Sequence, residues 1–344
     1  MITNEIRSIK NLTLHELKNW VKEKKYSQFR GKQVFNWIYE QFVNSPDEML
    51  NIPPKLRDEI KNYGNFNLLE AIKPERKIIN SSKKYLFKLV DGNYIESVLI
   101  LENERKTICL SSQVGCGLDC KFCQTAKMGF IRNLSVGEIV DQLLFIRNEI
   151  KEPITNVVFM GMGEPLLNYE NVIKSAIIIN DKNSLNIGAR KITISTSGIV
   201  PEIYKLAELK YQFKLAVSLN LPFDEKRTML MPINKKYKLN SLIKAMKYYN
   251  STTNKKITIE YVLMKNINDS EADVKQLIKI LKDIHCKINL IPFNENQTEF
   301  KRPTKDNILK FYKLINKKID STIRWSKGED ENAACGQLFW KNNR

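Results

Sequence analysis

Three cysteines, Cys116, Cys120 and Cys123, stand close together in the run Gly115-Cys-Gly-Leu-Asp-Cys-Lys-Phe-Cys123. Their Cys-x3-Cys-x2-Cys spacing lets one short loop supply three thiolates, one to each of three irons of a four-iron cubane. Structural iron–sulfur clusters normally use four cysteines, and so do most all-cysteine structural zinc sites. Three cysteines therefore predict a [4Fe-4S] cluster whose fourth iron is open to a small molecule.

Two other uses of these cysteines are weighed against the cluster. A disulfide is disfavoured because the chain has six cysteines in 344 residues and no secretory segment at its start, which suits a reducing cytosol. A zinc site is the stronger alternative, but it needs a fourth ligand from Cys109 or from the two histidines, His15 and His285, which are remote in sequence. Such a site would indicate a zinc-stabilised RNA-binding module without catalysis.

The charge of the chain indicates a polyanionic partner. The formal net charge is +18, which favours nucleic acid first and a membrane surface second. Residues 226–265 carry ten basic residues against the single acid Glu260, and residues 301–327 carry nine against Asp306 and Asp320. Lysine and asparagine are abundant throughout the chain, so a purely compositional origin is the competing explanation. The clustering favours contact with RNA or DNA.

Composition also bounds the class of protein. A hydrophobic content of 42% is enough for a sizeable core. No apolar run approaches the roughly 18 residues that a membrane-spanning helix requires. We therefore expect a soluble, cytoplasmic protein.

Strand-like and helical patterns alternate from residue 107 onward. Apolar strand-like runs fall at 107–112, 156–160, 191–196, 213–218, 257–263 and 286–292. Helical patterns lie between and after them, at 135–149, 169–180, 201–208, 239–250, 270–283 and 304–318. Six such units predict an α/β fold in which a parallel sheet forms an open partial (β/α)6 barrel with helices outside. Functional residues are expected at the carboxyl ends of the strands.

The chain divides into four predicted parts. They are a helical N-terminal accessory domain (1–72), a β-hairpin extension leading into the core (73–106), the (β/α)6 core (107–325) and a C-terminal tail (326–344). Within the extension, Asp91-Gly92 is a hairpin signal between the strand-like runs 84–89 and 94–101. The short tail contains Cys335.

Small and polar residues follow the predicted strands. Beyond the cysteine loop, these segments are Gly161-Met-Gly-Glu-Pro165, Ser195-Thr-Ser-Gly198, Ser218-Leu-Asn220 and Pro292-Phe-Asn294. Glycines allow a backbone to approach a ligand closely, and Glu164 can accept hydrogen bonds from an ammonium group. Turns alone use glycine, serine and asparagine, but their recurrence at corresponding positions predicts a ligand site beside the cluster.

Four motifs carry a family resemblance. They are Cys109-Leu-Ser-Ser-Gln-Val-Gly-Cys116, Gly161-Met-Gly-Glu-Pro165, Leu230-Met-Pro-Ile-Asn234 and Ala334-Cys-Gly-Gln-Leu338. Together they resemble the RlmN/Cfr family of radical S-adenosylmethionine (SAM) RNA methyltransferases. The similarity extends over most of the chain, including the helical N-terminal region. It implies the radical SAM partial (β/α)6 barrel and a cluster whose open iron chelates SAM.

The resemblance also implies roles for individual residues. Cys116, Cys120 and Cys123 become the cluster ligands. The residues placed around SAM are Gly163, Glu164, Ser195, Ser218, Leu219, Asn220 and Asn294. Cys335 becomes the methyl-carrying cysteine, Cys109 its partner, and Glu96 the acceptor of a proton. One departure is that the position of Asn220 is often histidine in relatives, which affects only the detail of SAM contact.

The implied chemistry explains why cysteines are needed. An aromatic C–H carbon of adenosine is not nucleophilic and cannot attack the methyl group of SAM directly. Cys335, as thiolate, would take a methyl group from one SAM. A 5′-deoxyadenosyl radical from a second SAM would then abstract hydrogen from that methyl group, and the resulting carbon radical would add to adenine. Glu96 or Cys109 would assist loss of the ring proton, and Cys109 would release the product by forming a disulfide with Cys335.

Three details favour the RlmN branch, which methylates C2 of adenosine in 23S rRNA and in tRNA. They are Glu96-Ser-Val-Leu-Ile100, Pro165 and Gly129-Phe-Ile-Arg-Asn-Leu134. The alternatives are the Cfr branch, which methylates C8 of adenosine and confers antibiotic resistance, and a radical SAM enzyme acting on a protein or small molecule. The expected partners are RNA and an electron donor such as flavodoxin or ferredoxin, with no membrane. We expect a monomer, and a structural role for Cys286.

Overall fold

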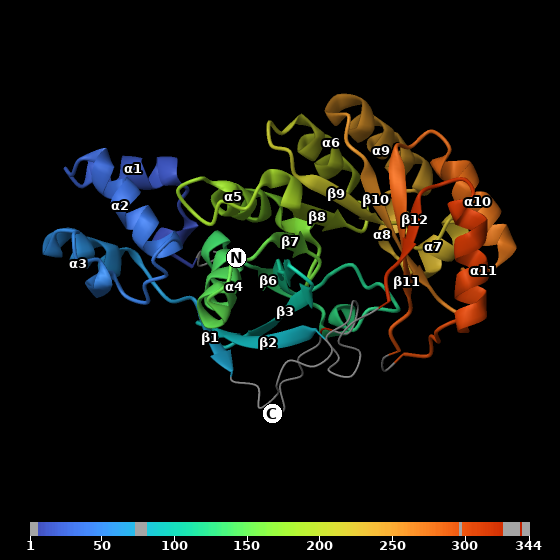
Figure 1. Cartoon of the computed structure of the whole chain (residues 1–344), viewed down its shortest axis with the longest axis horizontal. Coiled ribbons are helices and arrows are strands. Elements are labelled where there is room, and N and C mark those ends of the chain that lie inside the picture. The colour runs from blue at the N-terminus through green and yellow to red at the C-terminus, as the bar shows by residue number, and fades with distance from the viewer. Residues whose placement is uncertain (1–5, 73–80, 296–297, 326–337, 339–344) are drawn as a thin grey trace.

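The computed structural model describes residues 6–72, 81–295, 298–325 and 338. Its centre is a ten-stranded mixed sheet in the order β1-β2-β3-β4-β7-β8-β9-β10-β11-β12. The N-terminal helices lie at one end of the molecule, and α10 and α11 lie at the opposite end (Figure 1). Cys335 and most of the predicted tail lie outside the described residues.

The parallel part of the sheet forms the core of the fold. Its six successive strands are β4 (Arg105–Cys109), β7 (Asn156–Phe159), β8 (Ile192–Thr196), β9 (Lys214–Ser218), β10 (Ile257–Leu263) and β11 (Cys286–Pro292). The helices between and after them are α4 (Val136–Ile150), α5 (Tyr169–Asn180), α6 (Val200–Glu208), α9 (Leu239–Thr253), α10 (Glu271–Leu281) and α11 (Lys305–Asn316). These helices run along the outer side of the sheet (Figure 1). The predicted partial (β/α)6 barrel is confirmed.

Local sequence signals explain where two of these helices begin. Ser135 caps α4 and Ser270 caps α10, each with its hydroxyl accepting from the backbone N–H of the residue three positions on. The side chains of Glu138 and Asp273 accept in turn from the backbone N–H of Ser135 and Ser270, so each helix starts with a capping box.

One further parallel strand was not predicted. β12 (Ser321–Ile323) pairs with β11, with Ser321 opposite Ile288 and Ile323 opposite Leu290. Three residues are too few to display a periodic pattern. The strand carries the chain back to the carboxyl edge of the sheet, where Arg324 follows it.

Three antiparallel strands extend the sheet beyond β4. They are β1 (Leu69–Ile72), β2 (Ser82–Leu89) and β3 (Tyr94–Glu102). The predicted hairpin at Asp91-Gly92 is confirmed by β2 and β3. The prediction of helical structure up to residue 72 is wrong for the last four residues, because β1 pairs with β2, placing Leu69 opposite Leu89.

The N-terminal region is helical, as predicted for the residues before β1. Its helices are α1 (Leu14–Glu23), α2 (Gln28–Tyr39) and α3 (Pro54–Tyr63), with 3-10 turns η1 (Ile9–Asn11) and η2 (Pro46–Glu48). A buried ion pair, 2.7 Å between Lys10 Nζ and Asp141 Oδ1, ties this region to α4 of the core. Asp141 also accepts from the backbone N–H of Leu68.

The remaining elements are short and lie near the carboxyl edge of the sheet or in its connections. They are β5 (Gln113–Gly115), η3 (Thr125–Met128), β6 (Phe130–Asn133), η4 (Pro165–Asn168), η5 (Ala189–Lys191), α7 (Asp224–Leu230) and α8 (Ile233–Lys236). β5 and β6 form a separate two-stranded antiparallel sheet. Within the described residues, no helix is both long and apolar enough to cross a membrane.

Candidate functional site

A cavity of about 180 Å³ opens at the carboxyl ends of the parallel strands. Most of the predicted site residues line it. They are Cys116, Cys120, Cys123, Gly163, Glu164, Ser195, Ser218 and Asn220. These residues come from four successive strand–helix units. The expectation that the segments after the strands meet at one place is confirmed.

The cysteine loop is held at both ends by the small sheet of β5 and β6. Gly115 ends β5 with φ of 72°, and an added Cβ there would collide with the carbonyl oxygen of Gly129. That same carbonyl accepts a hydrogen bond from the N–H of Cys116 at 2.8 Å. Glycine is therefore required where the loop begins, because only a residue without Cβ allows this close approach.

The loop after β7 packs closely against residues 110–113, which lead into the cysteine loop. An added Cβ at Gly161 would lie 2.7 Å from the carbonyl of Leu110, and one at Gly163 would lie 2.5 Å from Cβ of Gln113. Gly163 also has φ of 96°, which disfavours other residues. The two glycines thus let Glu164 reach the cavity beside the cysteines.

Glu164 is buried and has oriented hydrogen-bond partners. One carboxylate oxygen accepts from the backbone N–H of Ser197 at 2.7 Å, and the other accepts from that of Leu166 at 3.1 Å. Burial raises the pKa of Glu164, while these hydrogen bonds act in the opposite direction. A buried carboxylate in a cavity favours a cationic ligand group, because an opposite charge offsets its lost hydration.

The three thiols suit a cationic cluster. Burial raises the pKa of Cys116 to about 12, and it raises the pKa of Cys120 well above its ordinary value, with Cys123 and Cys116 adding repulsion. Bound iron supplies the positive charge that stabilises all three as thiolates. In the described ranges, no three His, Cys, Asp or Glu side chains are placed to hold one metal ion. A cubane does not need that arrangement, because each thiolate binds a different iron.

Two of the predicted SAM contacts lie near the cavity without being among the described residues that line it. Leu219 is fully buried, and its carbonyl accepts from Nε of Arg227 at 3.2 Å. Asn294 is also buried, and its Oδ1 accepts from Arg302 at 3.4 Å. Any role of these two residues in ligand contact stays a prediction.

Asn220, a predicted SAM contact, occupies a special backbone position. Its φ is 56°, in the left-handed region where asparagine and histidine are both enriched among non-glycine residues. Its side-chain oxygen accepts from the N–H of Val262 at 2.9 Å, which fixes the loop against β10. Asparagine therefore suits the backbone conformation that this cavity wall requires.

Glu96 and Cys109 lie on the adjacent strands β3 and β4 and are not among the described residues that line the cavity. Glu96, on β3, is buried and forms an ion pair of 2.8 Å with Lys84. Cys109 ends β4 and is buried opposite Val98 of β3. The Ser111 hydroxyl donates to the carbonyl of Glu96 at 2.6 Å and accepts from the N–H of Met162 at 2.8 Å, so one residue joins β3 to the glycine loop.

Of the predicted C-terminal tail, the structure describes Leu338. Cys335, and with it the predicted disulfide to Cys109, lies outside the described residues, so both stay predictions. Leu338, three positions further on, lines the cavity, and its carbonyl accepts from the Thr125 hydroxyl at 2.7 Å. The described part of the tail therefore contacts the end of the cysteine loop.

Two charged residues of the cavity wall were not predicted. Glu260, on β10, lines the cavity; its Oε2 accepts from Asn289 at 2.8 Å, and burial raises its pKa. Arg324, which follows β12, lines the cavity as well. The available signal was the position of Glu260, an acid within an otherwise apolar predicted strand.

Arg227 lies in the basic stretch 226–265, for which the sequence predicts contact with RNA or DNA. It is fully buried, and it donates to the carbonyl of Ser197 at 2.6 Å and to Asn234 at 3.0 Å. Burial lowers its pKa to about 10. Arg227 joins the loops that follow β8 and β9, so the prediction of nucleic-acid contact is wrong for this residue.

Known families match the N-terminal region and the core of this chain. The family described as "Radical SAM superfamily" matches residues 110–279, and the one described as "Ribosomal RNA large subunit methyltransferase N-terminal domain" matches residues 8–64. Fold and cavity together define a radical SAM enzyme. Members of this class use a [4Fe-4S] cluster and SAM, and the cavity holds the three cysteines expected as cluster ligands and Glu164, expected as a hydrogen-bond acceptor for SAM.

Similarity to individual proteins is nearly full-length. A "Probable dual-specificity RNA methyltransferase RlmN" of Clostridium novyi (strain NT) is 45% identical, covering 98% of this chain and 100% of the relative. A protein of the same name from Thermotoga maritima is 43% identical, covering 98% of both. The crystal structure of a radical SAM methyltransferase from Sphaerobacter thermophilus has a TM-score of 0.92 at 39% identity, covering 96% of this chain and 98% of that one. The chain belongs to the RlmN family of radical SAM methyltransferases.

Proposed function

We propose that this protein methylates C2 of adenosine in 23S rRNA and in tRNA through a methyl-cysteine intermediate, using two SAM per turnover. The observation that supports this function most is the cavity that the three cysteines and Glu164 line together. Nearly full-length similarity to probable dual-specificity RNA methyltransferases supports it as well. Family membership alone does not identify the reacting carbon, the two RNA substrates or the residues that act.

Cofactor binding is assigned to the cavity. Cys116, Cys120 and Cys123 hold the cluster, and SAM contacts come from Gly163, Glu164, Ser195, Ser218, Leu219, Asn220 and Asn294. The Glu164 carboxylate, oriented by the N–H of Ser197, accepts hydrogen bonds from the ammonium of the methionine part of SAM. The cluster and SAM supply a carbon-centred radical strong enough to take hydrogen from a methyl group.

The catalytic residues are assigned outside the cluster loop. Cys335 carries the methyl group that becomes joined to adenine, and the Cys109 thiolate then attacks the Cys335 sulfur. This attack breaks the sulfur–carbon bond, releases the product and leaves a Cys109–Cys335 disulfide, which an external thiol reduces. Glu96 accepts the ring proton. The Lys84 ammonium lies 2.8 Å from the Glu96 carboxylate and orients it by this ion pair. Burial of Glu96 keeps this base away from bulk water.

Substrate binding is assigned to exposed basic residues. Lys235, Lys236 and Lys238 are exposed around α8, close in sequence to the cavity-lining Met231. An adenosine in folded RNA must be unstacked to enter a cavity, which costs roughly a few kcal/mol. Phosphate contacts by such lysines offset that cost and make binding strongly dependent on salt.

The remaining assignments follow the same proposal. A one-electron donor such as flavodoxin or ferredoxin reduces the cluster, and the protein works as a cytoplasmic monomer. We divide the chain into an accessory domain (1–72) that is helical before β1, a hairpin extension (73–106), a radical SAM core (107–325) and a tail (326–344). A separate N-terminal family matches residues 8–64, which supports an accessory domain that ends near residue 72.

The test uses cysteine variants of the anaerobically reconstituted enzyme. Cys335→Ala and Cys109→Ala should abolish transfer of labelled methyl groups from SAM to unmodified rRNA and tRNA. Cys286→Ala is the matched control, because Cys286 is a buried β11 residue with no assigned role. If both variants methylate RNA like the control, the methyl-cysteine route is wrong. An enzyme that cleaves SAM yet methylates neither RNA would indicate a protein or small-molecule substrate.

A further inference from the structure

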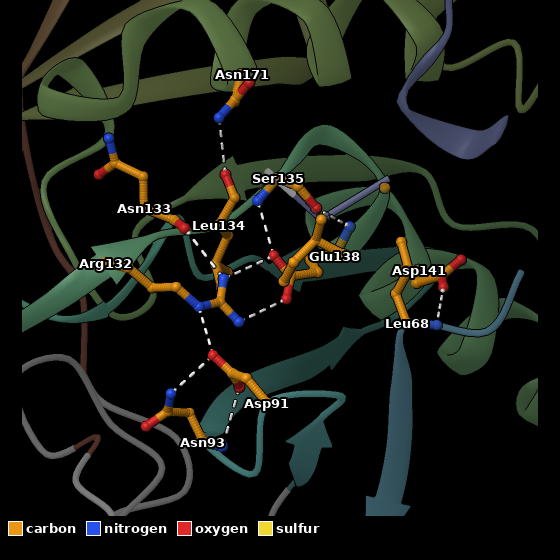
Figure 2. A network of polar contacts seen from close by, with 12 residues as sticks. Leu68, Asp91, Asn93, Arg132, Asn133, Leu134, Ser135, Glu138, Asp141 and Asn171 are labelled. Atoms are coloured by element: carbon orange, nitrogen blue, oxygen red, sulfur yellow. Dashed lines mark hydrogen bonds and ion pairs between the residues drawn. The ribbon is translucent and has the colours of Figure 1, made fainter. Parts of the chain in front are cut away.

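The strand that leaves the cysteine loop is tied to two distant elements by one side chain. Arg132 lies on β6, and its guanidinium donates to both carboxylate oxygens of Glu138, at 2.9 and 2.8 Å. Its Nε donates to Asp91 Oδ2 at 2.6 Å. Figure 2 shows these three residues converging from β6, from the first turn of α4 and from the turn between β2 and β3.

The Glu138 end of this contact is rigid. The Glu138 side chain has no exposed surface, and its Oε2 also accepts from the N–H of Ser135 at 2.8 Å as part of the capping box. A planar guanidinium facing a carboxylate through two parallel hydrogen bonds fixes orientation as well as distance. The start of α4 therefore defines where β6 lies.

The Asp91 end reaches the hairpin that carries Glu96. Asp91 stands in the turn between β2 and β3, and Asn93 donates to it through both its backbone N–H, at 3.1 Å, and its side chain, at 2.8 Å. Arg132 and Asn93 lower the pKa of Asp91, although burial acts the other way. Glu96 lies on β3, five positions after Asp91 in the chain.

We propose that Arg132 is a positioning residue that sets the cysteine loop against both α4 and the hairpin that carries Glu96. Its contact with Glu138 holds the loop in the shape that retains the cluster. Its contact with Asp91 fixes the distance between the loop and the proton acceptor. The second consequence rests on the proposed function, whereas the first concerns only the loop and its cluster.

Two variants separate the two contacts. Arg132→Lys keeps the positive charge but removes the guanidinium, whose several N–H groups bind Glu138 and Asp91 at the same time. Asp91→Asn removes the charge at the hairpin and leaves the Glu138 contact in place. The matched control is Glu149→Gln, which breaks a 2.7 Å ion pair between Lys83 of the same hairpin and the same helix α4, without touching β6.

The first measurement needs no RNA. We expect Arg132→Lys to retain at most half as much iron per chain after anaerobic gel filtration as the unsubstituted protein, and to show faster hydrogen exchange in peptides covering 113–133. Asp91→Asn and Glu149→Gln should retain iron like the unsubstituted protein. If Arg132→Lys does not fold, Glu138→Gln replaces it, because glutamine preserves the cap of α4 while removing the facing charge. Unchanged iron retention and exchange in the folded variant would overturn the proposal.

The second measurement is the ratio of methylated adenosine formed to 5′-deoxyadenosine released. Asp91→Asn should lower this ratio at least threefold with iron content unchanged, whereas Glu149→Gln should leave it unchanged. Equal decreases in both variants would mean that general loosening of the hairpin is responsible, and would overturn the role of the Asp91 contact. If the unsubstituted enzyme made no methyladenosine, the proposed function would fail, while iron retention would still decide the role of Arg132.

Discussion

The backbone N–H of Ser197 donates to the Glu164 carboxylate across 2.7 Å, joining the loop after β8 to the loop after β7. The second carboxylate oxygen accepts from Leu166 N–H. Two donors on a buried carboxylate hold it in one orientation before any ligand binds. The site is thereby organised in advance for a cationic group, which lowers the cost of binding SAM.

Glu164→Gln is expected to weaken SAM binding. A charge-assisted hydrogen bond contributes about 1.5–3 kcal/mol, which corresponds to roughly a 10- to 100-fold higher Kd. Because the pKa of Glu164 is raised, SAM binding should fall on acidification at a higher pH than for an exposed glutamate. The glutamine variant should lose that pH dependence. Equilibrium dialysis against pH checks both effects, and an unchanged Kd would contradict the role of Glu164.

Gly163→Ala is expected to destabilise the protein and the site. A side chain at φ of 96° costs on the order of 1–3 kcal/mol, and the added Cβ would also lie 2.5 Å from Cβ of Gln113. Gly188→Ala is the control, because no atom lies within 4 Å of an added Cβ and its φ of −54° suits alanine. Urea unfolding should show a lower midpoint only for Gly163→Ala. Equal midpoints would contradict this account of the glycine loop.

Lys10→Met is expected to loosen the N-terminal region from the core. It leaves Asp141 buried without its cation, a change that costs about 3–5 kcal/mol. Lys24→Met removes an exposed ion pair with Glu59 and should cost only about 0–1 kcal/mol. Thermal unfolding of the whole chain checks the difference. A Lys10→Met variant as stable as Lys24→Met would show that the buried pair does not hold this junction.

RNA binding is expected to depend steeply on salt through the lysines of α8. Replacing Lys235 and Lys236 with glutamine should weaken binding uniformly across RNA sequences. It should also reduce the slope of log K against log salt by about 1 for each phosphate that the protein no longer neutralises. The same change at the exposed Lys22 and Lys25 of the charge-balanced N-terminal region serves as control. A slope that stays unchanged in the α8 variant would exclude these lysines from RNA binding.

Sequence patterns predicted the elements of the core, because each unit repeats an apolar strand-like run followed by apolar residues at helical spacing. The residues after β7, β8 and β9 could be placed together for the same reason, since parallel strands end at one edge. β1 could not be assigned to the sheet, because its place depends on pairing with β2. Arg227 could not be separated from exposed basic residues, because its burial depends on loops that meet only in three dimensions.

Mass spectrometry of nucleosides identifies both the methylated carbon and the RNA that carries it. Unmodified 23S rRNA and tRNA would be treated separately with reconstituted enzyme, SAM and a reductant under anaerobic conditions, and then digested. We expect 2-methyladenosine in both RNAs. Finding 8-methyladenosine instead would place the reaction at the other ring carbon, and finding no methylated adenosine despite SAM cleavage would contradict RNA methylation by this protein.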